Sequence, residues 1–195
     1  MSFTEVDYKW FNVINSQVLQ FPFLDNIMIL FAEYVQYVFV FLILILWLLN
    51  KSNFRVIAFQ VMVSFTLAYS INRLIELFIF RERPFISHVV NQLVEHSANS
   101  SFPSDHATSA IVIAFTLWLS SLRYKHLWVW LAFGIAFSRI WVGVHYPFDV
   151  VAGILNGLMV ALFTHYILFK LKITEILIEK PIFQGKVQKE IVIND

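Results

Sequence analysis

The chain has 195 residues, of which 59% are hydrophobic and only 14% are charged, a balance far more apolar than that of a soluble domain of this size. Its net charge is +1 and no run of Lys or Arg is long enough to follow a nucleic-acid backbone, so nucleic acid is excluded as a partner. The sequence contains no Cys, which excludes thiol nucleophiles, disulfides and thiolate metal sites.

The first 22 residues place apolar side chains among polar ones at roughly helical spacing, a pattern typical of a helix lying in the membrane interface. The alternative interpretation is a frayed tail. Acidic residues stand where a signal peptide would be positively charged, and no small-residue cleavage site follows, so we expect this segment to be retained.

Apolar segments separated by short polar groups follow, and they predict about five transmembrane helices, since each needs about 20 apolar residues. Their expected bounds are residues 25–49, 56–80, 104–122, 127–144 and 147–169. A polar tail occupies residues 170–195. We therefore expect an all-α integral membrane protein with a single membrane-embedded domain over residues 1–195, without the inverted symmetry of transporters.

Basic residues predict the orientation of this bundle. With five spans, one face carries Lys51, Arg55, Arg123, Lys125 and Lys170. The positive-inside rule makes that face cytoplasmic, together with the C-terminal tail. The N-terminus and the polar residues 81–106 then share the outer face with Arg81, Arg83 and Arg139, and arginines on this side require a local anion to explain them.

The polar residues 81–106 form a long loop of the kind that is usually functional. A phosphoryl group in transfer spreads negative charge over its equatorial oxygens, so it needs fixed donors around it. Arg83 and Arg139 supply planar guanidinium forks. Ser104 follows a proline at the expected start of a helix, where free backbone N–H groups bind anions. These residues predict a phosphate site at the outer face.

The candidate nucleophile is His145. Asp149 lies four residues later, at the start of the last span, where it is expected to reach back and hold one ring nitrogen, leaving the other nitrogen basic. His106, in the first turn of the third span, is the candidate acid that protonates the leaving oxygen and then activates water. We expect His88 and His96, in the polar loop, to be solvated or to face lipid headgroups.

These segments resemble the signature of the type 2 phosphatidic acid phosphatase (PAP2) superfamily. That pattern is a Lys seven residues before Arg-Pro, then Pro-Ser-Gly-His, then Ser-Arg-x-x-x-Gly-x-His-x-x-x-Asp. The third part matches at every specified position in SRIWVGVHYPFD, and the resemblance covers roughly residues 55–165. It implies a PAP2-type helical bundle and a metal-independent lipid phosphatase that forms a phosphohistidine and needs no cofactor.

The chain departs from this pattern at two positions. Glu76 stands in the Lys position, and Asp105 replaces the Gly of the second part. Arg73, three residues before Glu76, either pairs with it to remove two charges from the membrane or borders the phosphate site with it. We expect Arg73, Glu76, Asp105 and Arg81 to lie beside the site rather than on the phosphate.

The segment SFPSDHA resembles the bacitracin-resistance branch of the family, which acts on undecaprenyl diphosphate. The resemblance therefore implies hydrolysis of this lipid diphosphate at the outer leaflet of the plasma membrane, in support of carrier-lipid recycling for cell-wall synthesis. A phosphatidate or phosphatidylglycerol phosphate phosphatase with the same residues is the alternative.

A protein of another class, a transporter or a binder of diphosphate lipids, is a further alternative. Such a protein would need the arginine cations but not an activated nucleophile. A metal site is disfavoured because two arginines point to the same place. The oligomeric state is not predicted.

The orientation gives a first prediction. A reporter fused after Asp195 should be active only in the cytoplasm, and one inserted near Asn91 only outside, because the basic loops must stay inside. Enzymatic topology reporters read both positions. External activity of the fusion at Asp195 would overturn the predicted orientation.

Overall fold

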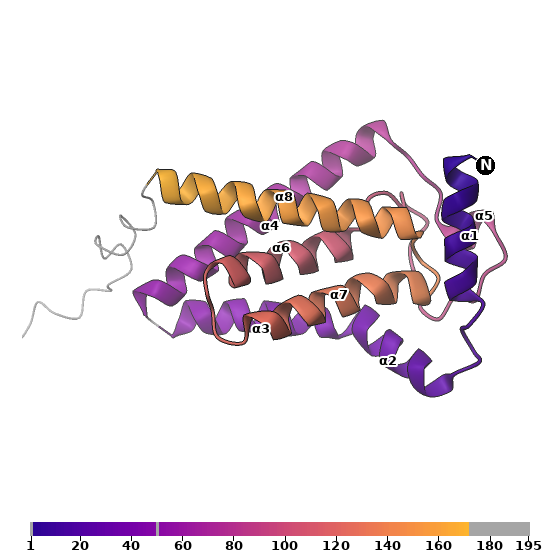
Figure 1. Ribbon diagram of the computed structural model, residues 1–195, viewed down its shortest axis with the longest axis horizontal. Coiled ribbons are helices and arrows are strands. Elements are labelled where there is room, and N and C mark those ends of the chain that lie inside the picture. Colours follow the sequence, from indigo (N-terminus) through magenta and orange to yellow (C-terminus); the bar gives the residue numbers. More distant parts are fainter. Residues whose placement is uncertain (1, 50, 172–195) are drawn as a thin grey trace, which may run out of the picture.

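The computed structural model describes residues 2–49 and 51–171, and within these ranges it contains helices and loops but no strand (Figure 1). The helices are α1 Phe3–Asn15, α2 Pro22–Glu33, α3 Val35–Leu48, α4 Ser52–Phe78, α5 Pro84–Ser87, α6 Asp105–Leu119, α7 Lys125–Trp141 and α8 Pro147–Lys170. The predicted tail, apart from its first two residues, lies outside the described residues.

Three helical stretches are long and apolar enough to cross a membrane: Pro22–Leu48, Ser52–Phe78 and Pro147–Leu168. The first comprises α2 and α3, which are separated at Tyr34 instead of forming the single helix expected from the sequence. Helix α6 is a shorter apolar helix, and α7 has 17 residues. The prediction of helices in all five segments is confirmed, whereas the number of membrane crossings remains a prediction.

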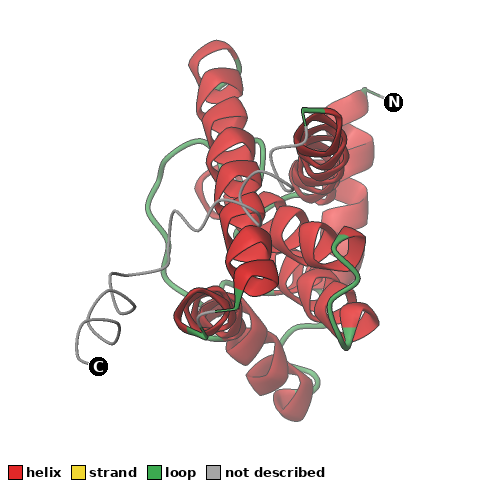
Figure 2. Ribbon diagram, turned by 90° about the vertical axis from the view of Figure 1, so that its left-hand side faces the viewer, coloured by secondary structure: helices red, strands yellow, loops and turns green. Residues whose placement is uncertain are grey.

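Helix α6 lies at the centre of the bundle, packed against α4, α7 and α8. Figure 2 views the bundle from the end at which α8 finishes, where several helices are seen nearly end-on. Two glycines let α8 approach α6 closely. A Cβ atom at Gly153 would lie 2.6 Å from the backbone oxygen of Ser104, and one at Gly157 would lie 2.9 Å from that of Thr108. This close contact brings the first turns of α6 and α8 together.

Buried amides link the three inner helices. Asn72 of α4 donates to Thr108 of α6 at 2.9 Å, and Asn156 of α8 donates to the Asn72 oxygen at 2.7 Å. Unpaired amides cost several kcal/mol in an apolar interior, so these bonds favour one register of the helices. The bundle therefore holds the start of α6 and the start of α8 in a fixed relation.

Helix α1 lies across the end of the bundle, transverse to the long helices (Figure 1). Ser2 and Glu5 form a capping box at its N-terminus. Phe11 is buried against Tyr146, with ring centroids 5.6 Å apart. Asn15 donates to the carbonyls of Asn91 and Trp141 at 2.9 and 3.2 Å. The predicted helix is present and docked, so the alternative of a frayed tail is wrong.

Candidate active site

The predicted site residues meet where α6 and α8 begin and α7 ends, beneath the transverse helix α1. Arg83 Nη1 lies 3.1 Å from His145 Nε2, which joins the first motif to the third. The backbone N–H of Ser104 donates to the carbonyl of Asp149 at 3.0 Å, which joins the second motif to the third. Segments distant in sequence therefore form one site.

A tight turn directs His145 into the protein. Gly143 has φ +84°, a left-handed conformation that favours glycine, and a Cβ atom there would lie 2.7 Å from the carbonyl oxygen of Asn91. The next two backbone N–H groups, those of Val144 and His145, both donate to the carbonyl of Arg139 at 3.2 Å. As a result His145 is only 1% exposed.

The hydrogen bonds of His145 define its tautomer. Arg83 can only donate, so His145 Nε2, at 3.1 Å from Nη1, carries the lone pair. The ring proton is then on Nδ1, which donates to the carbonyl of Ser101 at 2.8 Å. Burial lowers the pKa of His145 well below its ordinary value, and Arg83 and Arg139 lower it further. A neutral imidazole with a basic Nε2 is the form that a histidine nucleophile requires.

Asp149 does not bond directly to His145, in contrast to the sequence-based expectation. Its Oδ2 lies 3.7 Å from His145 Nδ1, beyond hydrogen-bond range. The same oxygen accepts from Ser101 Oγ at 2.5 Å and from the backbone N–H of Tyr146 at 2.9 Å. Because these donors occupy Oδ2, Ser101 stands between the aspartate and the histidine.

Sequence reasoning missed Ser101. Its side chain donates to Asp149 while its backbone carbonyl accepts from His145. The available signal was its position just before the Phe-Pro-Ser-Asp-His segment, which places it in the same loop as Ser104. A backbone carbonyl leaves no mark in a sequence, so the more direct of its two contacts was not predictable.

Among the described residues, three buried donors have no hydrogen-bond partner: Arg73 Nε, Ser104 Oγ and Arg139 Nε. Two of them, Ser104 Oγ and Arg139 Nε, belong to the predicted phosphate-binding residues. Arg139 is fixed by a bond from Nη1 to the carbonyl of Ala32 at 3.1 Å. Ser104 is the N-cap residue of α6, next to the free N–H groups of its first turn. Such unpaired donors suit the oxygens of a phosphoryl group.

Arg83 is already fully engaged. It donates from Nε and Nη2 to Asn99 Oδ1 at 3.1 and 2.9 Å, from Nη2 to Ser100 O at 3.2 Å, and from Nη1 to Val144 O at 2.9 Å as well as to His145. Burial lowers the pKa of Arg83 to about 10, so it remains protonated at neutral pH. Of these acceptors Asn99 is exposed, so its amide is the partner that an incoming phosphate can most readily replace.

The remaining histidines of the site are His106 and His96. His106 lies in the first turn of α6, as predicted. The ring centroid of His96 is 6.4 Å from that of His106 and 6.2 Å from that of His145. Burial, followed by Arg83, lowers the pKa of His96 to about 4. His96 therefore lies beside the site as a neutral, half-buried ring, whereas the sequence predicted a solvated residue or one facing lipid headgroups.

The two departures from the PAP2 pattern meet at Arg73. Arg73 Nη1 lies 2.5 Å from Glu76 Oε2, and Nη2 pairs with Asp105 Oδ2. Asn72 also donates to Asp105 Oδ1 at 2.9 Å. The predicted pairing of Arg73 with Glu76 is present, and Asp105 joins it. Because Asp105 is followed directly by His106, this ion-pair group also lies beside the site.

Arg81 contacts the site through Asp149. Arg81 Nη1 lies 2.7 Å from Asp149 Oδ1, and Nη2 lies 2.6 Å from Asp7 Oδ2 on α1. The guanidinium also covers the ring of Tyr146, with 4.0 Å from Cζ to the ring centroid. Arg81 thus pairs with carboxylates, while Arg83 contacts His145.

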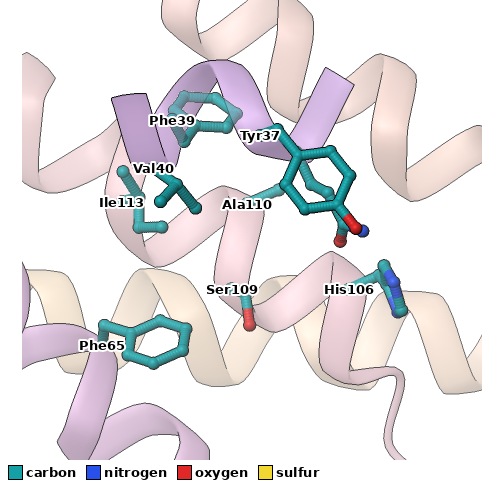
Figure 3. A pocket seen from close by; sticks show the side chains of 9 residues that line it. Tyr37, Phe39, Val40, Phe65, His106, Ser109, Ala110 and Ile113 are labelled. Atoms are coloured by element: carbon teal, nitrogen blue, oxygen red, sulfur yellow. The ribbon is translucent and has the colours of Figure 1, made fainter. Parts of the chain in front are cut away.

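A mostly apolar cavity of about 290 Å³ begins at His106 and extends between α3, α4 and α6 (Figure 3). Its lining comprises Gln36, Tyr37, Phe39, Val40, Phe65, His106, Ser109, Ala110 and Ile113. A second apolar cavity, of about 160 Å³, shares Val40, Phe65 and Ile113 with it. We call the two together the α3–α6 groove. A groove with polar residues at the His106 end and an apolar lining elsewhere suits an amphiphilic molecule.

Within the described part of the chain, no group of three or more His, Cys, Asp and Glu side chains is arranged to hold a metal ion. The donors that converge on the site are instead two arginines and a helix N-terminus. This set stabilises an anion, and with a neutral histidine beside it the arrangement is equipped for phosphoryl transfer to nitrogen.

Comparisons with known proteins agree with this chemistry. Residues 57–173 match the PAP2 superfamily. The chain is 34% identical to the undecaprenyl-diphosphatase BcrC of Bacillus subtilis over 85% of its own length and 83% of that protein. It is equally similar, at 34% over 85% of the chain and 82% of the relative, to the bacitracin transport permease protein BcrC of Bacillus licheniformis.

Two solved structures have the same fold. The chain superposes on LpxE of Aquifex aeolicus with a TM-score of 0.68, at 28% identity over 83% of this chain and 95% of that one. A phosphatidylglycerolphosphate phosphatase of Bacillus subtilis gives a TM-score of 0.62, covering 87% of each chain, and at 22% identity this likeness shows the fold alone.

The position of Ser101 gives a second prediction. Ser101→Ala removes the hydroxyl that bonds Asp149 but keeps the carbonyl that bonds His145. A hydrogen bond to a charged group contributes about 1.5–3 kcal/mol, so phosphoryl transfer should slow by about 10-fold to 100-fold. Steady-state kinetics of the purified variant measure this, with the exposed Ser97→Ala as the control. An unchanged rate would remove Ser101 from the site.

Proposed function

Because the chain belongs to the PAP2 superfamily, it is a membrane lipid phosphatase, and we propose that it hydrolyses undecaprenyl diphosphate to undecaprenyl phosphate and phosphate. The observation that carries the choice of lipid is the 34% identity to an undecaprenyl-diphosphatase over 85% of the chain. The whole chain then acts as one membrane-embedded catalytic domain. Release of the monophosphate returns carrier lipid to cell-wall synthesis and underlies resistance to bacitracin.

In the first proposed step, His145 Nε2 attacks the terminal phosphorus of the substrate. The bond from phosphorus to the bridging oxygen breaks as the bond to nitrogen forms, giving a phosphohistidine and undecaprenyl phosphate. The proton stays on His145 Nδ1, which donates it to the carbonyl of Ser101, so the imidazole gains positive charge as it attacks. Arg83, Arg139 and Ser104 bind the oxygens of the transferred group, whose charge they neutralise.

His106 serves both steps as the proton carrier. It donates a proton to the leaving oxygen in the first step and accepts one from water in the second. The resulting hydroxide attacks phosphorus, the bond to Nε2 breaks, and phosphate leaves. The position of His106 at the end of the α3–α6 groove supports this role, since the leaving oxygen is attached to the lipid chain.

The α3–α6 groove is the proposed site of the prenyl chain. Its lining is mainly apolar, and it connects the chemistry at His106 to residues such as Val40, which is 57% exposed. A lipid can then enter from the side of the bundle without its chain passing through water. In this proposal the site faces the outer side of the plasma membrane, α1 lies in that interface, and the C-terminus is cytoplasmic.

A third prediction separates substrates by their leaving groups. The oxygen expelled from a lipid diphosphate has a conjugate acid of pKa about 6, whereas phosphatidate expels an alkoxide whose alcohol resembles water, at about 15–16. General acid assistance of ~10² to 10⁴ matters most for the second. His106→Ala should therefore reduce phosphatidate turnover far more than that of undecaprenyl diphosphate.

The same variant should accumulate phosphohistidine from the diphosphate, because water is no longer activated in the second step. Acid-labile radiolabel on the protein measures this intermediate, and His145→Ala, which lacks the nucleophile, is the control that should show neither label nor turnover. Equal losses on both substrates without trapped label would contradict the proposed division of roles.

A fourth prediction concerns the groove. Val40→Trp fills it from its exposed side, so kcat/KM for undecaprenyl diphosphate should fall at least about ten-fold, since each buried methylene contributes ~0.8 kcal/mol. Hydrolysis of a short, water-soluble diphosphate should be unchanged. Val38→Trp, on the same helix, 43% exposed and outside the lining, is the matched control. Equal behaviour of the two variants on the long-chain substrate would place the prenyl chain elsewhere.

A further inference from the structure

We propose that Asp7, on the transverse helix α1, is a positioning residue for the nucleophile, acting through Arg81 on Asp149. This inference rests on the proposed function. It assigns the N-terminal helix to the active site, although the helix contributes no residue to the PAP2 pattern and precedes the matched residues 57–173.

The contacts form a continuous chain from α1 to the nucleophile. Asp7 Oδ2 lies 2.6 Å from Arg81 Nη2, and Arg81 Nη1 lies 2.7 Å from Asp149 Oδ1. Asp149 Oδ2 then accepts from Ser101 Oγ at 2.5 Å, and the carbonyl of Ser101 accepts from His145 Nδ1 at 2.8 Å. Every link in this chain is within hydrogen-bond or ion-pair range, and both carboxylates are fully buried.

Asp7 also holds the backbone beside Asp149. Its Oδ1 accepts from the N–H of Phe148 at 3.0 Å, in the first turn of α8, where helical N–H groups lack partners within the helix. Asp7 therefore holds the backbone at the start of α8 and, through Arg81, the side chain of Asp149 in the same turn. The ring of Tyr146 under the guanidinium restricts Arg81 in the remaining direction.

The charge of this group matters for the reaction. Asp7 and Asp149 with Arg81 between them leave one net negative charge next to Ser101. The imidazole of His145 becomes positive when its Nε2 bonds to phosphorus, and a nearby negative charge stabilises that state. The other charged or titratable groups facing His145 are Arg83, Arg139, His96 and His106, which come from the loop, α7 and α6. The net negative charge of Asp7, Asp149 and Arg81 thus partly compensates the positive charge of the arginines around His145.

The test uses a pair of substitutions with opposite charge. Asp7→Asn removes one negative charge, which should lower the pKa of His145 and move the acid limb of kcat/KM to lower pH, because His145 must be neutral to attack. Adding Arg81→Gln removes one positive charge and restores the original net charge. In the double variant, the acid limb of the pH profile of kcat/KM should therefore move back toward its wild-type position. The expected shift is on the order of half a pH unit to one pH unit.

Stability and turnover provide the contrasting readouts. Both variants break ion pairs, so thermal unfolding should occur at lower temperature in each. In each, kcat should also fall, because Arg81 loses its Asp7 partner in Asp7→Asn and its guanidinium is absent from the double variant, so Asp149 is positioned less firmly. Glu5→Gln is the control, because it makes the same charge change on the exposed side of the same helix. It should leave both kcat and the acid limb of kcat/KM as in the wild type.

The outcomes separate this inference from the proposed function. If the wild-type protein in detergent releases no phosphate from undecaprenyl diphosphate, the proposed function fails. If the wild type is active but Asp7→Asn leaves the acid limb and kcat unchanged, or if the double variant moves the limb further from the wild type, the positioning role of Asp7 is wrong. A loss of stability alone, with wild-type kcat and limb, also overturns it.

Discussion

The central constraint on this protein is that charged groups must be buried at one end of an apolar bundle. An unpaired buried charge costs several kcal/mol, so each ionic group near the site needs a partner of opposite sign or a full set of hydrogen bonds. Arg81 meets this need with Asp7 and Asp149, and Arg73 meets it with Glu76 and Asp105. Carboxylates thus pair with Arg73 and Arg81, and the buried Nε of Arg139 keeps a donor available for an anion.

The helix packing makes this separation possible. The glycines of α8 bring the first turns of α6 and α8 into contact, so that Ser104 and Asp149 are joined through the backbone. Ser104 lies on the α6 side of this contact, and Asp149, with its partner Arg81, lies on the α8 side. On the membrane side, α3 leaves a groove that starts at His106. One junction of two helices therefore lies beside both the candidate site and the groove.

Much of this arrangement was predictable, because the motif residues lie at or beside helix ends that are marked by Pro, Gly and polar side chains. Arg83 contacts His145, and the backbone of Ser104 is bonded to that of Asp149, at the end of the bundle where the sequence placed these motifs. The prediction was incomplete where the contact depends on tertiary structure. The bond from His145 to the Ser101 carbonyl involves a group present in every residue, and the pairing of Asp7 with Arg81 joins segments 74 residues apart (81 minus 7) whose packing no local pattern reveals. Likewise His96 resembled any loop histidine until the fold placed it beside His106.

The engagement of Arg83 by Asn99 has a consequence for the end of the catalytic cycle. When inorganic phosphate departs, the amide oxygen can return to the guanidinium, so the arginine exchanges one acceptor for another and is not left bare. The contribution of Arg83 to the free energy that holds the product is then only the difference between the two acceptors. Such an exchange favours rapid product release and weak inhibition by the phosphate present in the surroundings.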